Sequence, residues 1–162
     1  MLCAAMNPCP CGRGAVELGC RCSALEKQRY RKRISGPILD RIDLMVELRQ
    51  LTPDELVKAP EGESSAVVRE RVCAAREIQQ RRFRESGCFC NARMSPREMR
   101  RFCAIDVRGE QLLRQAIARF QLSPRAYDRI LKVARTIADL AGSDSIREEH
   151  LLEAVSYRES GL

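Results

Sequence analysis

The second half of the chain has the hydrophobic period of amphipathic helices. From residue 64 onward, apolar side chains recur every three or four positions, and the runs begin at Ser or Asp residues suited to cap a helix. Short helices joined by short turns are expected to pack as an antiparallel bundle. The expected inward-facing positions are Val68, Val72, Ala75 and Ile78, then Met99, Phe102 and Cys103, then Leu112, Leu113, Ala116, Ile117 and Phe120, then Ala126, Tyr127, Ile130, Leu131, Ala134, Ile137, Ala138 and Ala141, and finally Leu151, Leu152 and Val155.

Cap residues set the expected helix ends. The pattern predicts a helix over residues 64–85, and Ser95-Pro96 begins another with proline at its first position. Asp106 is expected to cap the next helix. The longest run starts at Ser123-Pro124 and ends at Gly142, and residues 145–148 are expected to cap the final helix.

The first half has continuous apolar runs in place of the helical period. Residues 1–6 and 43–48 are predicted to be buried strands, with a short basic helix over 23–33 between them. Thr52-Pro53-Asp54-Glu55 is a capping box that starts a brief helix. The pattern predicts a mostly α protein: an incomplete α/β piece over 1–50, a linker over 51–63 and a helical domain over 64–162.

Composition adds a preference for anionic partners. The 162 residues suffice for one domain or one and a part, and 29 Lys and Arg against 22 Asp and Glu give a net charge of +7. That charge favours a nucleic acid or a nucleotide as partner, although a solvated Arg-rich helical surface gives the same total. Aromatic residues make up only 4% of the chain, which argues against base-stacking platforms for single strands.

Nine cysteines, an odd number, fit poorly with a complete disulfide framework. They favour a cytoplasmic protein whose thiols are reduced or hold a metal. No apolar stretch approaches the roughly 18 residues of a membrane span, so no membrane partner is expected.

Two cysteine pairs lie close together in one glycine-containing loop. Cys9, Cys11, Cys20 and Cys22 are four thiols that could converge on one tetrahedral Zn²⁺, although each pair is separated by one residue where two to four are usual. Reduced cysteines in a loop, or thiols prone to adventitious disulfides, remain the alternatives. Cys73, Cys88, Cys90 and Cys103 are interpreted as incidental, and His150, the one histidine of the sequence, is expected to be an ordinary residue at the surface or its boundary.

Two arginines occupy positions that call for an anion. Arg41 lies where the predicted strand begins, and its guanidinium is costly there unless a carboxylate such as Asp40 or Asp43, or a phosphate, is near. Arg125 lies in the first turn of its helix, where the helix dipole disfavours cations. A salt bridge, plain exposure or a phosphate would each account for Arg125.

Three blocks of sequence, in this order, resemble one known family. They are AAMNPCPCG at 4–12, SGPILDRIDL at 35–44 and KVARTIADL at 132–140. Together they resemble the magnesium-chelatase-like AAA+ ATPases of bacteria, in the ComM/YifB competence-associated group. The resemblance runs almost end to end and covers the C-terminal part of such a protein.

The resemblance implies roles for three residues. Asn7 matches the sensor-1 asparagine, which helps to orient the water that attacks the γ-phosphate. Arg41 matches the arginine finger, which reaches into the nucleotide site of the neighbouring subunit. Arg125 matches the sensor-2 arginine, which contacts the γ-phosphate from its own subunit, although Arg129 and Arg135 on nearby turns compete for that role.

For the complete protein, the resemblance implies a homo-hexamer that uses ATP and Mg²⁺ to remodel DNA, with branch migration as the activity. The sequence holds no G-x-x-x-x-G-K-[ST] loop and no apolar strand ending in acidic residues, so this chain is expected to be inactive alone. One alternative is a magnesium chelatase ATPase subunit, against which the cysteine loop argues. Another is a non-enzymatic zinc-containing module that binds nucleic acid.

Overall fold

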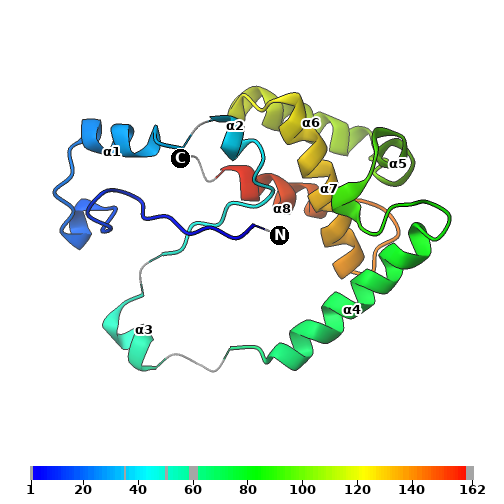
Figure 1. Cartoon of the computed structure of the whole chain (residues 1–162), viewed down its shortest axis with the longest axis horizontal. Helices are drawn as coiled ribbons and strands as arrows, with labels where there is room; N and C mark the ends of the chain where they lie inside the picture. The colour runs from blue at the N-terminus through cyan, green and yellow to red at the C-terminus, as the bar shows by residue number, and fades with distance from the viewer. Residues whose placement is uncertain (1, 35, 50, 59–61, 160–162) are drawn as a thin grey trace. The chain divides into compact units, whose positions relative to one another are not determined.

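The computed structural model describes residues 2–34, 36–49, 51–58 and 62–159. Contacts divide the chain into two compact units, with the boundary along the sequence between Ile42 and Asp43, and each is treated by itself. The helices, labelled in Figure 1, are α1 (Ala24–Arg31), α2 (Gly36–Leu39), α3 (Pro53–Val57), α4 (Ser65–Arg82), α5 (Pro96–Phe102), α6 (Val107–Phe120), α7 (Pro124–Leu140) and α8 (Glu148–Glu159), with single 3₁₀ turns at η1 (Val16–Leu18) and η2 (Asn91–Arg93).

Several of the predicted caps form in the second unit. Asp106 accepts a hydrogen bond from the Gly109 N–H at 2.8 Å and Ser123 accepts one from the Ala126 N–H at 3.2 Å. Ser95 and Glu98 form the predicted reciprocal capping box, with proline at the start of α5. Each cap satisfies a backbone donor that the helix start leaves without a partner, which explains why these helices begin where the sequence indicates.

Helix α7 is the centre of the bundle. It contacts α4, α5, α8 and η2, and α8 also packs on α6. Gly142 follows the end of α7 with φ of +64°, the left-handed conformation expected of a C-terminal glycine cap. The prediction of a helical bundle is confirmed, and its main cluster of buried apolar residues consists of Phe83, Met94, Met99, Cys103, Leu113, Ala116, Ile130, Leu131, Ala134, Ala138, Ile146, Leu151, Ala154 and Val155.

Several predictions about packing in the bundle are wrong, among them the expectation that Ala141 and Leu152 face inward, since both are exposed. Val68 and Val72 of α4 are 39% and 48% exposed, because only the C-terminal half of α4, from Ala75 onward, packs on the other described helices. His150 was expected at the surface or its boundary, but it is buried at 4% exposure. Its Nδ1 accepts the Arg147 N–H at 3.0 Å, so the imidazole caps the start of α8.

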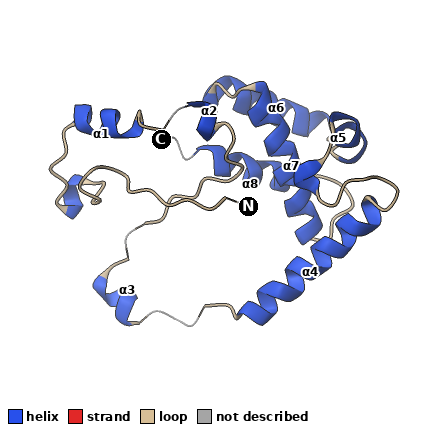
Figure 2. Ribbon diagram, viewed as in Figure 1, coloured by secondary structure: helices blue, strands red, loops and turns tan. Residues whose placement is uncertain are grey.

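The two predicted strands do not form among the described residues. Residues 2–6 and 43–48 are extended loops, and Figure 2 shows helices and loops alone in the described part of the chain. The apolar run after Asp43 lies largely exposed, with Leu48 at 87%. A strand needs a neighbouring strand to pair its backbone groups, and the described chain supplies none.

The remaining helices of the first half follow the sequence signals. α1 begins at the predicted basic segment, where Ser23 and Glu26 form a capping box, and α3 begins at the capping box of Thr52 and Glu55. Helix α2 was not predicted; it starts at the Gly36-Pro37 step, because proline is tolerated in the first turn of a helix. None of the described helices is both long and apolar enough to cross a membrane.

Candidate functional site

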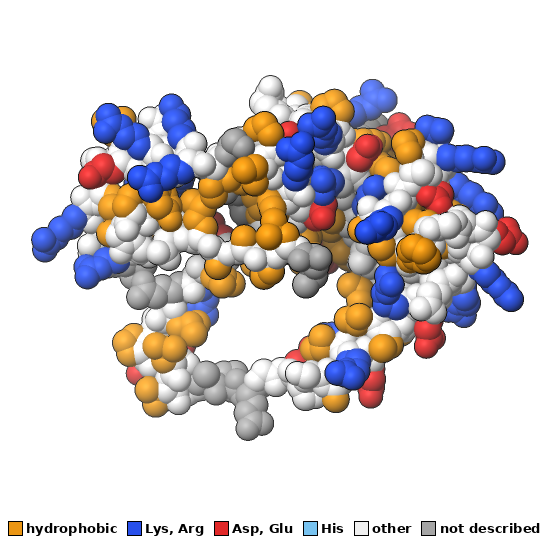
Figure 3. Space-filling view, in the orientation of Figure 1, with side chains coloured by type: hydrophobic (Ala, Val, Ile, Leu, Met, Phe, Trp, Pro, Cys, Tyr) orange, Lys and Arg blue, Asp and Glu red, His pale blue; other side chains and the backbone are white. Residues whose placement is uncertain are grey.

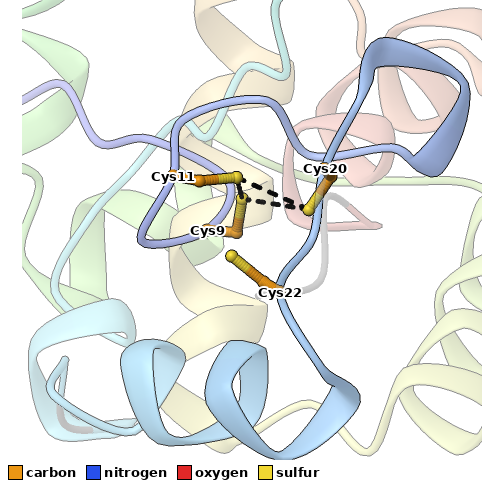
Figure 4. A group of neighbouring side chains, drawn as sticks. All are labelled: Cys9, Cys11, Cys20 and Cys22. Carbon is orange, nitrogen blue, oxygen red and sulfur yellow. Dashed lines mark hydrogen bonds between the residues drawn. The ribbon is translucent and has the colours of Figure 1, made fainter.

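The four cysteines of the first loop converge on one point. Their sulfur atoms all lie within 4.8 Å of one another, and Figure 4 shows the four side chains pointing toward a common centre. The Sγ of Cys9 lies 3.3 Å from that of Cys11 and 3.7 Å from that of Cys20, and the sulfurs of Cys11 and Cys20 are 3.6 Å apart. All four thiols are free, with none joined in a disulfide.

The loop backbone is shaped to bring these sulfurs together. Gly12, Gly14 and Gly19 have φ of +80°, +73° and +78°, values that residues with a side chain rarely adopt. The Gly14 N–H donates to the Cys9 Sγ at 3.3 Å. The Cys20 N–H donates to the Ala15 carbonyl at 3.1 Å, which closes the loop between the two cysteine pairs.

The thiols of the cluster differ strongly in pKa. Burial raises the pKa of Cys9, but the Gly14 N–H and the sulfurs of Cys11 and Cys20 outweigh burial and hold that pKa at about 6. The Cys11 N–H lowers the pKa of Cys22, yet the neighbouring thiols and burial together raise it to about 12. Four thiolates this close repel one another, so full ionisation of the set requires a cation at its centre.

The geometry fits zinc better than the sequence spacing suggested. Tetrahedral Zn²⁺ with Zn–S bonds of about 2.3 Å places its sulfurs about 3.8 Å apart, close to the sulfur separations in this loop. The donor set is entirely thiolate, which selects soft cations such as zinc. Cys9 and Cys20 are 0% and 7% exposed, so two ligands are already shielded from water. The cluster can therefore hold a metal ion.

Asn7 opens the same loop and faces a hollow of the first unit. The hollow has a volume of about 520 Å³ and is lined by Ala5, Met6, Asn7, Tyr30, Arg33 and Ile34. The Asn7 side chain also packs against Gly12, where a Cβ would lie 3.6 Å from the Asn7 Nδ2. The asparagine amide is exposed and available to a ligand.

Arg41 is exposed at the end of the first unit, after α2. Its Nη1 donates to the Pro37 carbonyl at 3.0 Å, a contact that leaves most of the guanidinium free. Within the described chain, Arg41 forms no ion pair, and Asp43 pairs with Arg129 instead. No described carboxylate therefore neutralises Arg41.

The three candidate arginines of α7 differ in their partners. Arg129 is committed to the Asp43 carboxylate. Arg135 is 2% exposed, and its guanidinium donates to Asp139 and to the carbonyls of Ser143 and Asp144. Arg125 is exposed at the start of α7 and has no hydrogen bond or ion pair with any described residue. It alone of the three is available to a ligand.

A buried ionic cluster that sequence reasoning missed holds the end of α7. Arg82 of α4 binds both oxygens of Asp139, at 2.7 and 2.5 Å, and Asn91 of η2 donates to the same carboxylate at 2.7 Å. Burial lowers the pKa of Arg135, which Asp139 opposes. The signal was present in the sequence, because Arg135 and Asp139 lie four positions apart within the apolar stripe of α7. The block at 132–140 thus has a structural role.

Comparison with known proteins identifies a family. The profile "Magnesium chelatase, subunit ChlI" matches residues 1–56, and the profile of its C-terminal region matches residues 62–158. The chain is 44% identical to the uncharacterized protein YifB of Salmonella typhimurium, 45% to YifB of Escherichia coli and 43% to the competence protein ComM of Haemophilus influenzae.

Each of these alignments covers 97% of this chain but 30% of the relative, so the chain spans about a third of the length of the proteins it matches. The two profiles follow one another along the chain, with the C-terminal profile covering the helical bundle. The chain therefore belongs to the magnesium chelatase ChlI-like family, in which it corresponds to the C-terminal portion of proteins of the ComM and YifB kind.

Proposed function

We propose that this chain is the part of a magnesium-chelatase-like ATPase that supplies three nucleotide-facing side chains to a ring of identical subunits working on DNA. Arg125 would contact the γ-phosphate of ATP in its own subunit, and Arg41 would reach the ATP of the neighbouring subunit. Asn7 would orient the attacking water. The similarity to a competence protein supports DNA as the substrate of the complete protein.

The observation that carries this proposal is the difference among the arginines of α7. Arg129 and Arg135 are held by Asp43 and Asp139, whereas Arg125 has no described partner although it lies where the helix dipole disfavours a cation. A phosphate at the start of α7 would be attracted both by the guanidinium and by the helix N-terminus. An exposed arginine without a carboxylate suits a ligand that is present only part of the time.

Arg41 supports the in-trans half of the proposal. It forms no ion pair among the described residues and is exposed. An arginine that approaches a transferring phosphoryl group from a second subunit stabilises charge in the transition state, and such a residue contributes about 10³- to 10⁵-fold to hydrolysis. ATP binding does not depend on this contact, so the two steps separate experimentally.

The test uses the complete protein. Arg41→Ala is expected to retain ATP binding and to lose hydrolysis by about 10³-fold or more. Arg125→Ala is expected to weaken both ATP binding and hydrolysis. Arg114→Ala is the matched control and should hydrolyse ATP as the wild type does. It removes an exposed arginine whose ion pair with Glu110 is long, at 3.9 Å, and exposed to solvent.

Mixed rings separate contacts within a subunit from contacts between subunits. Arg41→Ala subunits, which still bind ATP, are mixed with subunits that cannot bind ATP but keep Arg41. At junctions where the intact Arg41 faces an ATP-loaded site, hydrolysis should recover. If no mixture regains activity, Arg41 does not act on a neighbouring subunit.

For the cysteine loop, we propose a structural Zn²⁺ held by Cys9, Cys11, Cys20 and Cys22. When bound, zinc neutralises the four thiolates and fixes the loop that carries Asn7. Metal analysis of the purified, reduced chain should find one zinc per chain and almost none in a Cys9→Ser/Cys20→Ser variant. A zinc content near zero in the reduced wild-type chain would refute the site.

A further inference from the structure

The net positive charge of the chain is concentrated in one short segment. Residues 13–33 hold seven cations and two carboxylates, a net charge of +5, whereas the other 141 residues together carry only +2. This segment begins inside the cysteine loop and ends just after α1, so its cations belong to the first unit. We call residues 13–33 the basic segment.

Six of the seven cations of the basic segment are exposed and Lys27 is half-buried; none of the seven forms an ion pair with a described carboxylate, although the charge of Glu26 acts on Arg29. Glu26, the carboxylate within α1, is occupied by the capping box, where it accepts from the N–H and the hydroxyl of Ser23 at 2.8 Å each. In Figure 3, Lys and Arg side chains project into solvent from the region of α1. The exposed cations that have no ion pair or ring contact with any described residue are Arg21, Arg29, Arg31, Lys32 and Arg33.

A second group of arginines, on η2, α5 and α6, differs in this respect. Residues 93–119 hold seven arginines and three carboxylates, but several of these arginines are used within the bundle. Arg101 lies 4.9 Å from the ring centre of Phe102, and Arg119 lies 5.2 Å from that of Phe120. The basic segment keeps a larger share of its cations available to an external anion.

The cysteine loop fixes the position of the cations of the basic segment. Ser23, the N-cap of α1, directly follows Cys22, and the Lys27 Nζ donates to the Gly14 carbonyl at 2.7 Å. Helix α1 is thus joined to the loop both at its start and through its second turn. Arg29 and Arg31 lie in the last turn of α1, Lys32 is its C-cap, and Arg33 lies in the turn that follows, so these four cations are grouped at the C-terminal end of α1.

We propose that the basic segment binds the phosphate backbone of duplex DNA, in a sequence-independent manner, and that the metal-bound cysteine loop holds α1 in position for it. The proposal rests on the proposed function, since it names the surface through which the complete protein would hold DNA. Arginine dominates the segment, and its planar guanidinium pairs with two phosphate oxygens at once.

An anionic membrane is a poorer match for the same charges. A helix that lies on a membrane needs a continuous apolar face to insert. In α1 the only large hydrophobic side chains are Leu25 and Tyr30, five positions apart, so such a face is missing. The recognition therefore depends on the exposed charges of the basic segment.

The experiment titrates a short fluorescein-labelled DNA duplex with the zinc-loaded 162-residue chain and measures fluorescence anisotropy over a range of salt concentrations. The variant Arg29→Gln/Arg31→Gln/Lys32→Gln/Arg33→Gln should bind at least ~10-fold more weakly, and its log–log salt dependence should fall by about 3 to 4, because each lost phosphate contact removes about 0.9 from the slope. A charge-preserving variant, Arg29→Lys/Arg31→Lys/Arg33→Lys, should keep the slope.

The matched control removes four cations from the other group. In Arg93→Gln/Arg97→Gln/Arg100→Gln/Arg108→Gln, all four positions are exposed and the change in net charge is the same. Its slope should stay within about 1 of the wild type. If the control loses as much affinity as the α1 variant, or if the α1 variant binds as the wild type does, the proposal is wrong.

Two further measurements separate the parts of the proposal. Removal of zinc, checked by metal analysis, should weaken DNA binding several-fold; unchanged binding would overturn the role of the metal loop and leave the charge surface standing. Sedimentation with phosphatidylserine vesicles should show no loss of binding specific to the α1 variant, and such a loss without an effect on DNA would assign the surface to membranes. Neither result depends on ATP hydrolysis, so the proposed roles of Arg41 and Arg125 are judged separately.

Discussion

The cysteine loop and the helical bundle reach a defined structure by different means. The loop over residues 9–22 has few buried apolar side chains, and its turns depend on glycines and on four sulfurs that surround one point. In the described part of the bundle, fourteen buried apolar residues pack in one cluster, and an ionic cluster is enclosed at the end of α7. A short loop cannot bury enough apolar surface to hold itself, so the metal ion that we propose for the four cysteines would do there what a hydrophobic core does in the bundle.

The same contrast separates the candidate ligand-binding residues from the structural ones. Asn7, Arg41 and Arg125 are exposed, whereas Arg82 and Arg135 are turned inward onto Asp139. The arginines named here thus fall into two groups, those that pair with a carboxylate inside the bundle and those that are exposed to a ligand. Removing a buried arginine should lower the stability of the fold, whereas removing an exposed one should weaken ligand binding and leave stability unchanged.

The largest effect on stability is expected from Asp139→Ala. It leaves the guanidinium groups of Arg82 and Arg135 buried without their shared carboxylate, which costs about 3 to 5 kcal/mol in comparable cases. Urea denaturation followed by circular dichroism measures the free energy of unfolding. Asp128→Ala, an exposed aspartate of the same helix, is the control and should change it by less than about 0.5 kcal/mol.

The apolar core should respond nearly as strongly. Leu113→Ala removes a side chain that is 1% exposed and should lower the free energy of unfolding by about 2 to 5 kcal/mol. Leu152→Ala, at a position 53% exposed, is the matched control. Metal content should stay the same in both variants; a loss of zinc in Leu113→Ala would mean that the loop depends on the bundle for its structure.

A smaller effect is expected where the extended segment after Arg41 joins the bundle. Asp43 pairs with Arg129, and the Met45 N–H donates to the Tyr157 carbonyl at 3.1 Å. Because the Asp43 side chain is 56% exposed, Asp43→Ala should cost no more than about 1 kcal/mol. Amide exchange at Met45 should nevertheless rise. Unchanged exchange there would show that the ion pair does not hold the segment.

The sequence predicted the structure of the helical half better than that of the first half. The caps at Ser95, Asp106 and Ser123 were predictable because capping is local, and so was the burial of α7. The strands were not, because an apolar run becomes a strand only beside another strand. The Asp139 cluster also escaped, since its partners Arg82 and Asn91 lie 57 and 48 residues away in sequence.

The candidate site shows the same limit. The spacing of Cys9, Cys11, Cys20 and Cys22 indicated a metal site, but three glycines with positive φ decide whether the sulfurs can meet. Sequence alone left Arg125, Arg129 and Arg135 as competitors. Their hydrogen bonds single out Arg125 as the one without a described partner, and these contacts depend on residues distant along the chain.

The smallest effect is expected from acid titration of α3. Arg49, which binds the Glu55 carboxylate, and the Thr52 N–H lower the pKa of Glu55 to about 2. Because this folded-state pKa lies below the ordinary value of about 4.3, the carboxylate's contribution is complete above that pH and is lost as the pH falls toward 2. A carboxyl NMR titration should show the low pKa in the wild type and a higher value in Arg49→Ala. An equally low pKa in the variant would assign the shift to the cap alone.

The most direct test of the contrast between the two regions is hydrogen exchange of the zinc-loaded and the zinc-free chain. Removal of zinc should raise amide exchange over residues 9–33 by about tenfold or more, while the buried helices α6, α7 and α8 keep their protection. That result would show that a metal holds the first region and a hydrophobic core the second. Equal exchange in the two forms, or a loss of protection spread evenly over both regions, would contradict the account.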